Sequence, residues 1–471
     1  MAFDPSAYLS RQARGRPINA IRSLMPKENK PGLISLLAGK PNPAGFPFES
    51  ISMTLKPSAV KACGADGKPL TITLEGDELN RVLQYGSQNI DPALEAQLDP
   101  LIATVQGRDR KSGTPDGDFQ IAVGSGSQDL LVKTLSAVLD PEDTVLVEAP
   151  VYPGVIPELT SCGVQTVHVA VDDEGLSANA LRSTLANWKT DSKTKDLKFP
   201  KLVYTVPTGG NPAGTTASKQ RKQAVLAVAR EYGILILEDD PYYYLTFNNL
   251  EGDKERTPSY FALEREGGDK YGYGYVVRLE SFSKIMSAGM RLGFMMGAPA
   301  IVNTVISYIA STSLHASAPP QVMAARLLEH WGVDGFLEHT LNVAQMYKKR
   351  RDMFDADAVE FLGAGKTGTQ QPLAQWVTPV AGMFFWIKLH LPPTPDAPQG
   401  DSFQIISERA VSCGVLAMPG SAFYATPTKT PYVRASFSLV HEDEMGEALR
   451  RLRTAVQGAW KDAGFDTIPP M

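Results

Sequence analysis

The most constraining feature of this chain is a run of branched aliphatic residues, Ile234–Leu237, followed at once by the acids Glu238, Asp239 and Asp240. A strand that is apolar at every position is typical of a parallel strand that a sheet buries on both faces. Buried carboxylates are costly unless they have a partner, and a protonated ring nitrogen of a ligand is such a partner. The run therefore predicts a parallel α/β sheet with a ligand site at its carboxyl edge.

Strand and helix patterns alternate on both sides of this run, which favours an α/β fold. Strands are predicted near residues 119–123, 144–147, 167, 201–206, 275–279, 291–297, 382–389, 415–418 and 432–438, and helices near 92–101, 130–138, 177–188, 219–232, 299–314, 318–331, 335–357, 403–413 and 442–460. Residues 248–274 are polar and glycine-rich, and they predict a surface loop.

The length of 471 residues and the hydrophobic content of 43% allow more than one core. We expect an N-terminal arm with part of a small domain over 1–75, a large ligand-binding domain over 76–335 and a small C-terminal domain over 336–471.

Composition excludes several classes of function. The 46 basic and 51 acidic residues give a net charge of −5, which argues against a nucleic-acid surface built on overall charge. Cys63, Cys162 and Cys413 lie far apart without metal-type spacing, so we expect free thiols in a reducing compartment and no metal site. No apolar run approaches the roughly 18 residues that a bilayer span needs, so we expect no membrane association.

The composition of the N-terminal segment is relevant to the cellular compartment of the protein. It contains Arg11, Arg14 and Arg16 with Asp4 as the nearby acid, a composition that keeps a mitochondrial presequence open as an alternative. We expect a cytoplasmic protein with an ordered N-terminal arm.

Lys284 stands in an unusual setting after the predicted strand 275–279. Ser281 and Ser283 precede it and Arg291 follows it. A lone lysine in a polar turn is most often a solvated surface group. Two hydroxyls and an arginine, however, can hold a dianionic phosphate beside an amine that forms a Schiff base. This combination suits pyridoxal phosphate.

Two other turns carry related signals. Residues 124–128, Gly-Ser-Gly-Ser-Gln, open the predicted helix near 130, and a helix start offers free backbone N–H groups to an anion. Many α/β turns are rich in glycine, so this turn by itself does not define an anion site. Residues 207–214, Pro-Thr-Gly-Gly-Asn-Pro-Ala-Gly, form a more specific pattern, because an ordinary turn rarely has both prolines so placed.

Ser-Phe-Ser-Lys at 281–284, followed by Gly-Met-Arg-Leu-Gly at 289–293, resembles the cofactor-lysine segment of fold-type I aminotransferases. Within these, the chain is similar to the branch of fungal aromatic aminotransferases and kynurenine/2-aminoadipate aminotransferases. Further segments match the family in order over about residues 16–460, namely 38–43, 83–86, 207–214, 239–242 and 432–438. The resemblance implies a large α/β domain with a mainly parallel, seven-stranded type of sheet, plus a smaller α/β domain.

The resemblance also implies roles for individual residues. Lys284, Asp239 and Tyr242 are the implied catalytic residues. Pyridoxal phosphate is bound by Ser127, Gln128, Tyr152, Asn211, Asp239, Tyr242, Ser281, Ser283, Lys284 and Arg291, with Tyr85 contributed to the neighbouring subunit of a homodimer with shared active sites. Substrate is bound by Arg434 at its α-carboxylate, and by Arg16, Gly39 and Asn211. Lys40 departs from the apolar residue expected in the family.

The implied reaction is ping-pong transamination, from an aromatic or 2-aminoadipate/kynurenine-like amino acid to 2-oxoglutarate. Its partners are thus amino acid and 2-oxo acid substrates. Another reaction on the same scaffold, such as a β-lyase, stays open because the motifs define the cofactor better than the reaction. A pyridoxal-phosphate-sensing regulator is a further alternative, although it needs an N-terminal winged-helix domain and the arm begins here within the first twenty residues.

Overall fold

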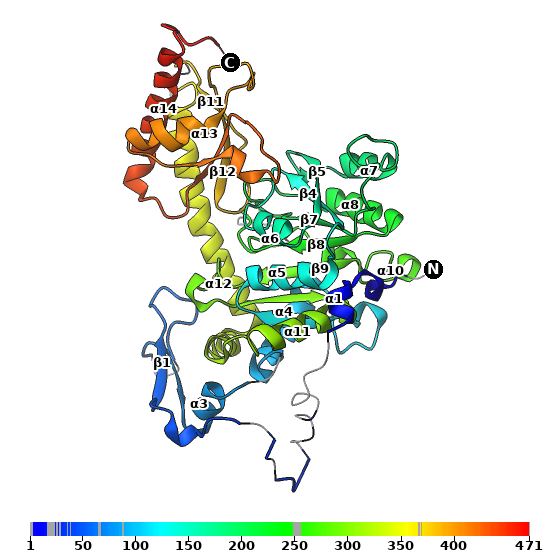
Figure 1. Cartoon of the computed structure of the whole chain (residues 1–471). Helices are drawn as coiled ribbons and strands as arrows, with labels where there is room; N and C mark the ends of the chain where they lie inside the picture. The colour runs from blue at the N-terminus through cyan, green and yellow to red at the C-terminus, as the bar shows by residue number, and fades with distance from the viewer. Residues whose placement is uncertain are drawn as a thin grey trace. The chain divides into compact units, whose positions relative to one another are not determined.

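The computed structural model describes residues 3–16, 24, 27, 30–34, 36, 37, 39–64, 67–86, 89–247, 256–365, 368 and 370–470. The chain forms two compact units (Figure 1): unit 1 contains residues 1–143 and 258–339, and unit 2 contains residues 144–257 and 340–471. These units cut across the domain boundaries at residues 75 and 335 that the sequence suggests, and those boundaries stay a prediction.

Unit 1 contains a three-stranded sheet in the order β3-β10-β9 and a hairpin of β1 and β2. Its strands are β1 (Ser50–Thr54), β2 (Thr71–Glu75), β3 (Gln120–Gly124), β9 (Val276–Ser281) and β10 (Gly293–Gly297). Its helices are α1 (Arg11–Arg14), α3 (Gly76–Leu83), α4 (Pro92–Gln106), α5 (Ser127–Val138), α9 (Tyr260–Leu263), α10 (Gly268–Tyr271) and α11 (Pro299–Thr312). Helix α12 (Ala318–Phe361) bends at Gly332 and continues into unit 2.

Unit 2 contains a sheet in the order β8-β7-β4-β5-β6, in which β8, β7, β4 and β5 are parallel, and a second sheet in the order β11-β12-β14-β13. The first sheet has strands β4 (Thr144–Ala149), β5 (Gln165–Asp172), β6 (Gly175–Leu176), β7 (Leu202–Thr205) and β8 (Leu235–Asp239), with helices α6 (Ile156–Ser161), α7 (Ala178–Ala186) and α8 (Lys219–Tyr232). The second has β11 (Ala374–Gln375), β12 (Phe384–Leu389), β13 (Met418–Pro419) and β14 (Tyr432–Ser436), with helices α13 (Ser402–Gln404) and α14 (Met445–Asp462) and a π-helical turn (Ile405–Ala410).

The predicted alternation of strands and helices is confirmed, and its central run forms β8, which is buried at every position. Because β4, β7 and β8 are parallel, their carboxyl ends lie at one edge of the sheet, where Ala149, Thr205 and Asp239 are the last strand residues. In unit 1, β3 and β9 both pair antiparallel with β10, so their carboxyl ends also share an edge. The polar segments of the sequence follow these strand ends.

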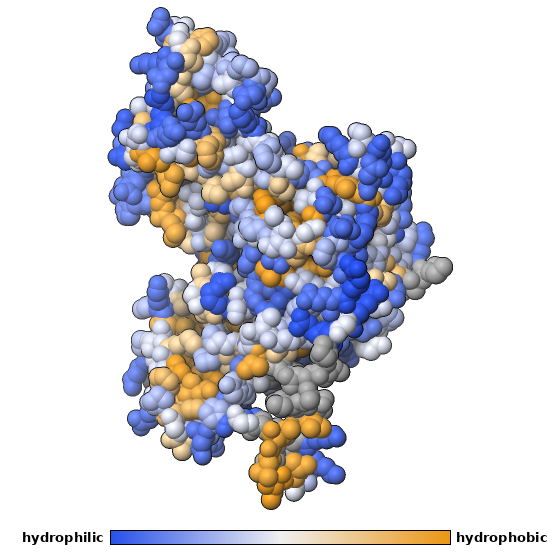
Figure 2. Space-filling model, in the orientation of Figure 1, coloured by the Kyte–Doolittle hydropathy of each residue, from blue (hydrophilic) through white to orange (hydrophobic). Residues whose placement is uncertain are grey.

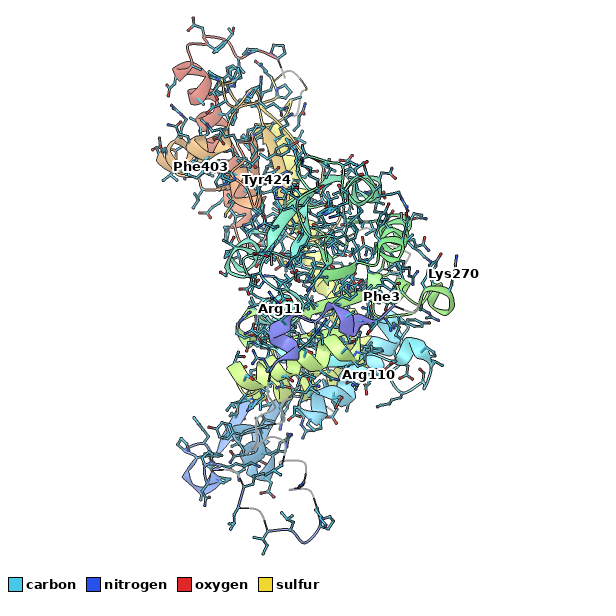
Figure 3. The ribbon with its side chains drawn as sticks, turned by 45° about the vertical axis from the view of Figure 1, so that its right-hand side comes forward. Phe3, Arg11, Arg110, Lys270, Phe403 and Tyr424 are labelled. Atoms are coloured by element: carbon cyan, nitrogen blue, oxygen red, sulfur yellow. The ribbon has the colours of Figure 1, made fainter. Side chains whose placement is uncertain are left out.

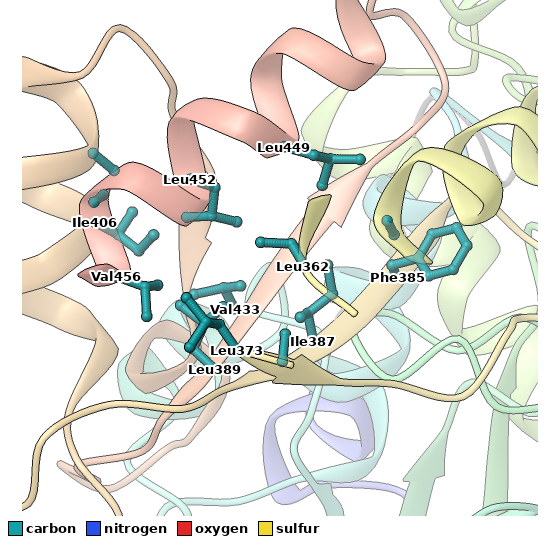
Figure 4. Packing of buried hydrophobic residues seen from close by; sticks show 14 of the residues in the cluster. Leu362, Leu373, Phe385, Ile387, Leu389, Ile406, Val433, Leu449, Leu452 and Val456 are labelled. Carbon is teal, nitrogen blue, oxygen red and sulfur yellow. The ribbon is translucent and has the colours of Figure 1, made fainter. Parts of the chain in front are cut away.

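The second sheet of unit 2 separates an apolar face from a mixed face by strict alternation. On β12 and β14, Phe385, Ile387, Leu389 and Val433 enter a buried cluster that α14 covers with Leu449 and other apolar side chains (Figure 4). The alternate positions of the two strands, including Trp386 and Arg434, belong to the opposite face. One set of strands therefore builds a core and leaves a second face for ligand contacts.

The N-terminal segment packs on unit 1 through specific contacts. Phe3 stacks on Tyr275 with ring centroids 3.7 Å apart, and the fully buried Ser10 bonds to Ala137 through its backbone N–H at 2.8 Å. Arg11 at the start of α1, labelled with Phe3 in Figure 3, pairs with Asp140. Residues 3–16 are thus an integral part of unit 1.

Two regions differ from the sequence prediction. The surface loop predicted at 248–274 is wrong for its described part, because α9 and α10 form there and Tyr260 and Phe261 are fully buried; residues 248–255 lie outside the described residues. The β1–β2 hairpin and α3 were not predicted, because their buried faces are made by tertiary packing against Ala318 and Val322 of α12. Among the described residues, no helix is long and apolar enough to cross a membrane.

Candidate active site

The carboxyl edge of the unit 2 sheet holds a buried carboxylate in a set of hydroxyl groups. Asp239 ends β8, and its Oδ2 accepts a hydrogen bond of 2.8 Å from the hydroxyl of Tyr204 on β7. Its neighbour Asp240 accepts instead from Thr208, at 3.1 Å. Burial raises the pKa of the Tyr152 and Tyr242 phenols, and the nearby charge of Asp239 raises both further. Asp239 is therefore the carboxylate that faces the aromatic residues of this edge.

The phenols of this edge stay protonated at neutral pH. Burial is the largest cause that raises the pKa of Tyr242, followed by the charge of Asp239, while a hydrogen bond with Asn211 acts in the opposite direction. Burial likewise raises the pKa of Tyr152 and of Tyr204. Neutral hydroxyls are hydrogen-bond donors, so Tyr242 can donate to a ligand oxygen.

Arg434 of β14 reaches the same edge. Its Nη1 donates to Asn211 Oδ1 at 2.9 Å, and its guanidinium carbon lies 4.3 Å from the ring centroid of Phe384. Burial lowers the pKa of the guanidinium, while Tyr242 and Tyr152 raise it. Its Nε is buried and has no hydrogen-bond partner among the residues that the structure describes. A desolvated guanidinium with an unused donor suits a carboxylate ligand.

A second carboxyl lies behind this edge, on β4. Glu148 is buried and accepts hydrogen bonds from the Thr205 hydroxyl at 2.6 Å and from the backbone N–H of Val206 at 3.3 Å. Burial raises the pKa of Glu148 to about 7, against these two hydrogen bonds, which lower it. Glu148 thus ties β4 to the end of β7, just before the turn that contains Asn211.

Unit 1 contains an anion cradle at the start of α5. Gly126 is the N-cap with a φ of 86°, and no side chain caps the helix. Arg291, itself left-handed at φ 49°, donates to Ser125 O at 3.1 Å and to Ser283 Oγ at 3.3 Å. A Cβ at residue 126 would lie 2.6 Å from Arg291 Nη2, so only glycine lets the guanidinium approach the helix start. A non-glycine residue held at positive φ is typical of functional sites.

Lys284 lies three residues after the end of β9, in the turn that begins at this cradle. The hydroxyl of Ser281 accepts from the backbone N–H of Ser283 at 3.2 Å, which shapes the turn. On its far side, His339 of α12 donates from Nε2 to Ile285 O at 2.7 Å and stacks on Trp331. The lysine is therefore half-buried in a turn that is fixed on both sides.

The structure places the other predicted residues of unit 1 separately. Ser127 and Gln128 form the first turn of α5, next to the cradle. Tyr85 is 53% exposed, near the ring of His315, whose Nε2 accepts from the N–H of Gly86 at 3.1 Å. Gly39 is exposed, and Arg16 lies over the ring of Tyr308 at 3.7 Å. None of the contacts found among the described residues joins Arg16 or Gly39 to the cradle.

The structure thus brings together Tyr152, Asn211, Asp239, Tyr242 and Arg434 in unit 2, and Ser281, Ser283, Arg291 and the start of α5 in unit 1. Four residues near these sites are not predicted from the sequence: Tyr204, Glu148, His339 and His315. The strand ends of β4 and β7 signal the first two, since a polar residue in an apolar strand needs a partner. The two histidines gave no local signal, because their partners are distant in the sequence.

The comparisons with known proteins agree with these features. The model of the family "Aminotransferase class I and II" matches residues 71–452. The aminotransferase tdiD of Emericella nidulans is 40% identical, over 95% of each chain, and the mitochondrial kynurenine/alpha-aminoadipate aminotransferase of Bos taurus is 33% identical, over 94% of this chain and 95% of that protein. Among solved structures, the aromatic aminotransferase Aro9 of Candida albicans has a TM-score of 0.81 at 26% identity, over 98% of this chain and 99% of that chain.

The chain belongs to the class I and II aminotransferase family. It is a pyridoxal-phosphate-dependent transaminase with the fold-type I architecture, so the predicted family, fold class, enzyme class and cofactor are confirmed.

The residues present fit this cofactor. The glycine-bounded cradle, with Arg291 and Ser283 around the start of α5, suits a phosphate dianion. The buried Asp239 carboxylate suits a protonated ring nitrogen, and the neutral Tyr242 hydroxyl suits a phenolate oxygen. When bound, the cofactor supplies an electron sink for the electrons released at the substrate Cα.

We predict that Tyr204→Phe lowers kcat/KM by roughly 10- to 150-fold, because a hydrogen bond to a buried charge is worth about 1.5–3 kcal/mol. Steady-state kinetics measures the change, and we expect it in kcat more than in KM, since Tyr204 contacts Asp239. Tyr275→Phe, which removes a hydroxyl bonded to Tyr271 O in unit 1, is the matched control. A Tyr204→Phe enzyme within two-fold of wild type would show that the bond does not position Asp239.

Glu148 gives a prediction for the pH dependence of stability. Its folded-state pKa of about 7 lies above the ordinary glutamate value of 4.5, so its stabilising contribution is complete below about pH 4.5 and is lost as the pH rises through 7. Glu148→Gln should therefore gain stability relative to wild type between pH 5 and pH 8, on the order of 3 kcal/mol. Urea unfolding at each pH measures the difference.

The matched control for Glu148→Gln is Glu447→Gln. The carboxyl of Glu447 has its pKa lowered to about 2 by hydrogen bonds from Arg450 and Arg451, so its replacement should not alter the pH dependence above pH 5. If the free energy of unfolding had the same pH dependence in wild type and Glu148→Gln, the raised pKa of Glu148 would be contradicted.

Proposed function

We propose that this transaminase moves the amino group of an aromatic or kynurenine/2-aminoadipate-like amino acid to 2-oxoglutarate by a ping-pong mechanism. The names of its relatives support this substrate class, since the bovine protein is a kynurenine/alpha-aminoadipate aminotransferase and the Candida albicans protein is an aromatic aminotransferase. The observation that carries the proposal is Arg434, whose half-buried guanidinium has a buried, unused Nε. Its central carbon lies 4.3 Å from the ring centroid of Phe384 and 5.2 Å from that of Phe423. A carboxylate anchor in an aromatic setting suits such amino acids.

The proposed roles follow the family motif that each residue matches. Lys284 carries the cofactor and then moves the proton between the substrate Cα and the cofactor. Asp239 holds the proton on the ring nitrogen, Tyr242 and Asn211 donate to the phenolate oxygen, and Tyr152 stacks on the ring. The phosphate is held by Ser127, Gln128, Ser281, Ser283 and Arg291. Arg434 binds the α-carboxylate, whereas Gly39 and Arg16 serve the rest of the substrate.

We propose that the protein is a homodimer in which Tyr85 acts on the neighbouring subunit's site. The tyrosine is 53% exposed, and its backbone is fixed by the contact of Gly86 with His315. Earlier in the chain, Ile34 and Leu36 of unit 1 are 91% and 98% exposed. Figure 2 shows a hydrophobic patch over this N-terminal segment, at the lower end of the view. Exposed apolar surface of this kind supports a subunit contact.

We propose a cytoplasmic location. The arginine-containing segment that resembles a presequence is integrated into unit 1, where Ser10 is fully buried and Arg11 pairs with Asp140. A cleavable presequence would not be expected to make such contacts, although the bovine relative is named as mitochondrial.

We predict that Arg434→Ala weakens donor and acceptor alike. A bidentate, partly desolvated contact contributes roughly 2–5 kcal/mol, or on the order of 30- to several thousand-fold in kcat/KM. Arg16→Ala should weaken selectively the substrates with a second carboxylate. The test compares phenylalanine, tyrosine, kynurenine, 2-aminoadipate, aspartate and alanine as donors, with the exposed Arg450→Ala as the control. A strong preference for aspartate or alanine, or an unaffected Arg434→Ala enzyme, would reject the proposal.

We predict that mixed inactive variants regain activity if Tyr85 acts across a dimer. Random reassociation of Tyr85→Ala with Lys284→Ala gives hybrids with one intact site, and thus about a quarter of wild-type activity. Each variant reassociated with itself is the control. A mixture no more active than its parts, or a fully active monomer in light scattering, would refute the shared site.

A further inference from the structure

A pocket of 560 Å³ lies in unit 2, apart from the residues assigned to cofactor and substrate. Its lining comes from two parts of the unit: Pro150 with the turn 213–216, and the mixed face of the second sheet with Trp386, Lys388 and Tyr432. Trp376, which follows β11, completes this second part. None of the described residues that line it is Lys284, Asp239, Tyr242 or Arg434. The volume lies within the range of about 300–1,000 Å³ that is typical of small-molecule sites. We call it the Trp386 pocket.

The Trp386 pocket has rigid aromatic walls. The rings of Trp386 and Tyr432 are stacked, with centroids 5.2 Å apart and an interplanar angle of 10°. The indole N–H of Trp376 donates to Asp355 at 2.7 Å, which fixes that ring. Tyr424, labelled in Figure 3, also lines the pocket and lies near the ring of His168. Aromatic side chains held in this way favour a planar apolar ligand.

The charge in the pocket favours an anionic group on that ligand. Lys388 pairs with Tyr432 in the β12–β14 register, and its side-chain amine has no hydrogen-bond or ion-pair partner among the described residues. Of the two acids that also line the pocket, Asp172 already binds Arg221 through both oxygens, at 2.8 and 2.9 Å. Asp173 is exposed. Lys388 is therefore the half-buried charge that a ligand can neutralise.

The pocket adjoins the substrate arginine through the sheet. Trp386 is the strand partner of Arg434, and Tyr432 precedes Arg434 by two residues, so all three belong to one face. Ala213, in the lining, follows Asn211 by two residues, and Asn211 accepts the hydrogen bond from Arg434. A ligand in the pocket would thus contact Trp386 and Tyr432 beside Arg434, and Ala213 near Asn211.

From these observations we propose that the Trp386 pocket binds an aromatic carboxylate, which modulates catalysis without occupying the substrate site. The ring packs against Trp386 and Trp376, and the carboxylate pairs with Lys388. Binding alters substrate turnover through the Arg434–Asn211 bond. This site goes beyond the proposed transamination, and it does not depend on which amino donor the enzyme prefers.

The experiment measures binding of 4-hydroxyphenylacetate, which has neither an amino nor a 2-oxo group and cannot react. The calorimetry uses the cofactor-loaded Arg434→Ala enzyme, because this variant weakens carboxylate binding at the substrate site. Binding of the ligand that is still detected should therefore report the Trp386 pocket. Adding Lys388→Met to this background should weaken binding roughly 10-fold or more, and Lys388→Arg should restore it. Lys429→Met is the matched control, since this lysine lines a separate pocket of 700 Å³.

Two further measurements complete the test. In wild type, 4-hydroxyphenylacetate should change kcat as well as KM for the amino donor, and the change in kcat should disappear in Lys388→Met. Tyramine, which carries an amine in place of the carboxylate, should bind more weakly. The proposal would be overturned if Lys388→Met bound the ligand as well as its parent, or if Arg434→Ala alone lost all binding. Purely competitive inhibition, or tighter binding of tyramine, would also overturn it. If Arg434 were not the substrate anchor, the comparison of Lys388→Met with its parent would still show whether the ligand binds in the Trp386 pocket.

Discussion

The burial of the Asp239 carboxylate is the constraint on which the rest of the unit 2 site depends. A charge at the end of a fully buried strand costs several kcal/mol unless donors and a cationic partner surround it. Tyr204 supplies one donor at 2.8 Å. In the proposed site, the protonated ring nitrogen of the cofactor would supply the cation. The same negative charge, together with burial, keeps Tyr242 and Tyr152 protonated. Burial and this one carboxylate therefore act together to keep the surrounding phenols protonated.

The second sheet of unit 2 connects the stability of a core to the position of Arg434, the proposed substrate anchor. Val433 and Ile387 pack into a buried cluster, and the alternate residues Arg434 and Trp386 occupy the other face. A shift of one residue in the β12–β14 register would move Arg434 into the apolar core, where an unpaired guanidinium is costly. The core thus fixes the position of Arg434, the proposed substrate anchor, because the register that buries the apolar residues also places Arg434 on the opposite face.

Residue patterns predicted the parts of the site that depend on local sequence. A buried parallel strand ending in Asp239, a glycine-rich helix start at Gly126, and Lys284 near Arg291 are signals within a few residues. Tyr204, Glu148 and His339 escaped prediction because each acts on a partner that only folding brings close. The helices at 260–271 escaped for a similar reason, since their polar composition hides the buried Tyr260 and Phe261.

The sequence by itself determined the α/β alternation, the family and the cofactor, because periodicity and motifs are properties of consecutive residues. Tertiary structure decided which hydroxyl supports Asp239, which face of β14 carries Arg434 beside Asn211, and how the Trp386 pocket is assembled from segments far apart in the chain. These features depend on strand order and register. Such long-range pairings are selected by the burial of whole faces, and no short stretch of sequence encodes them.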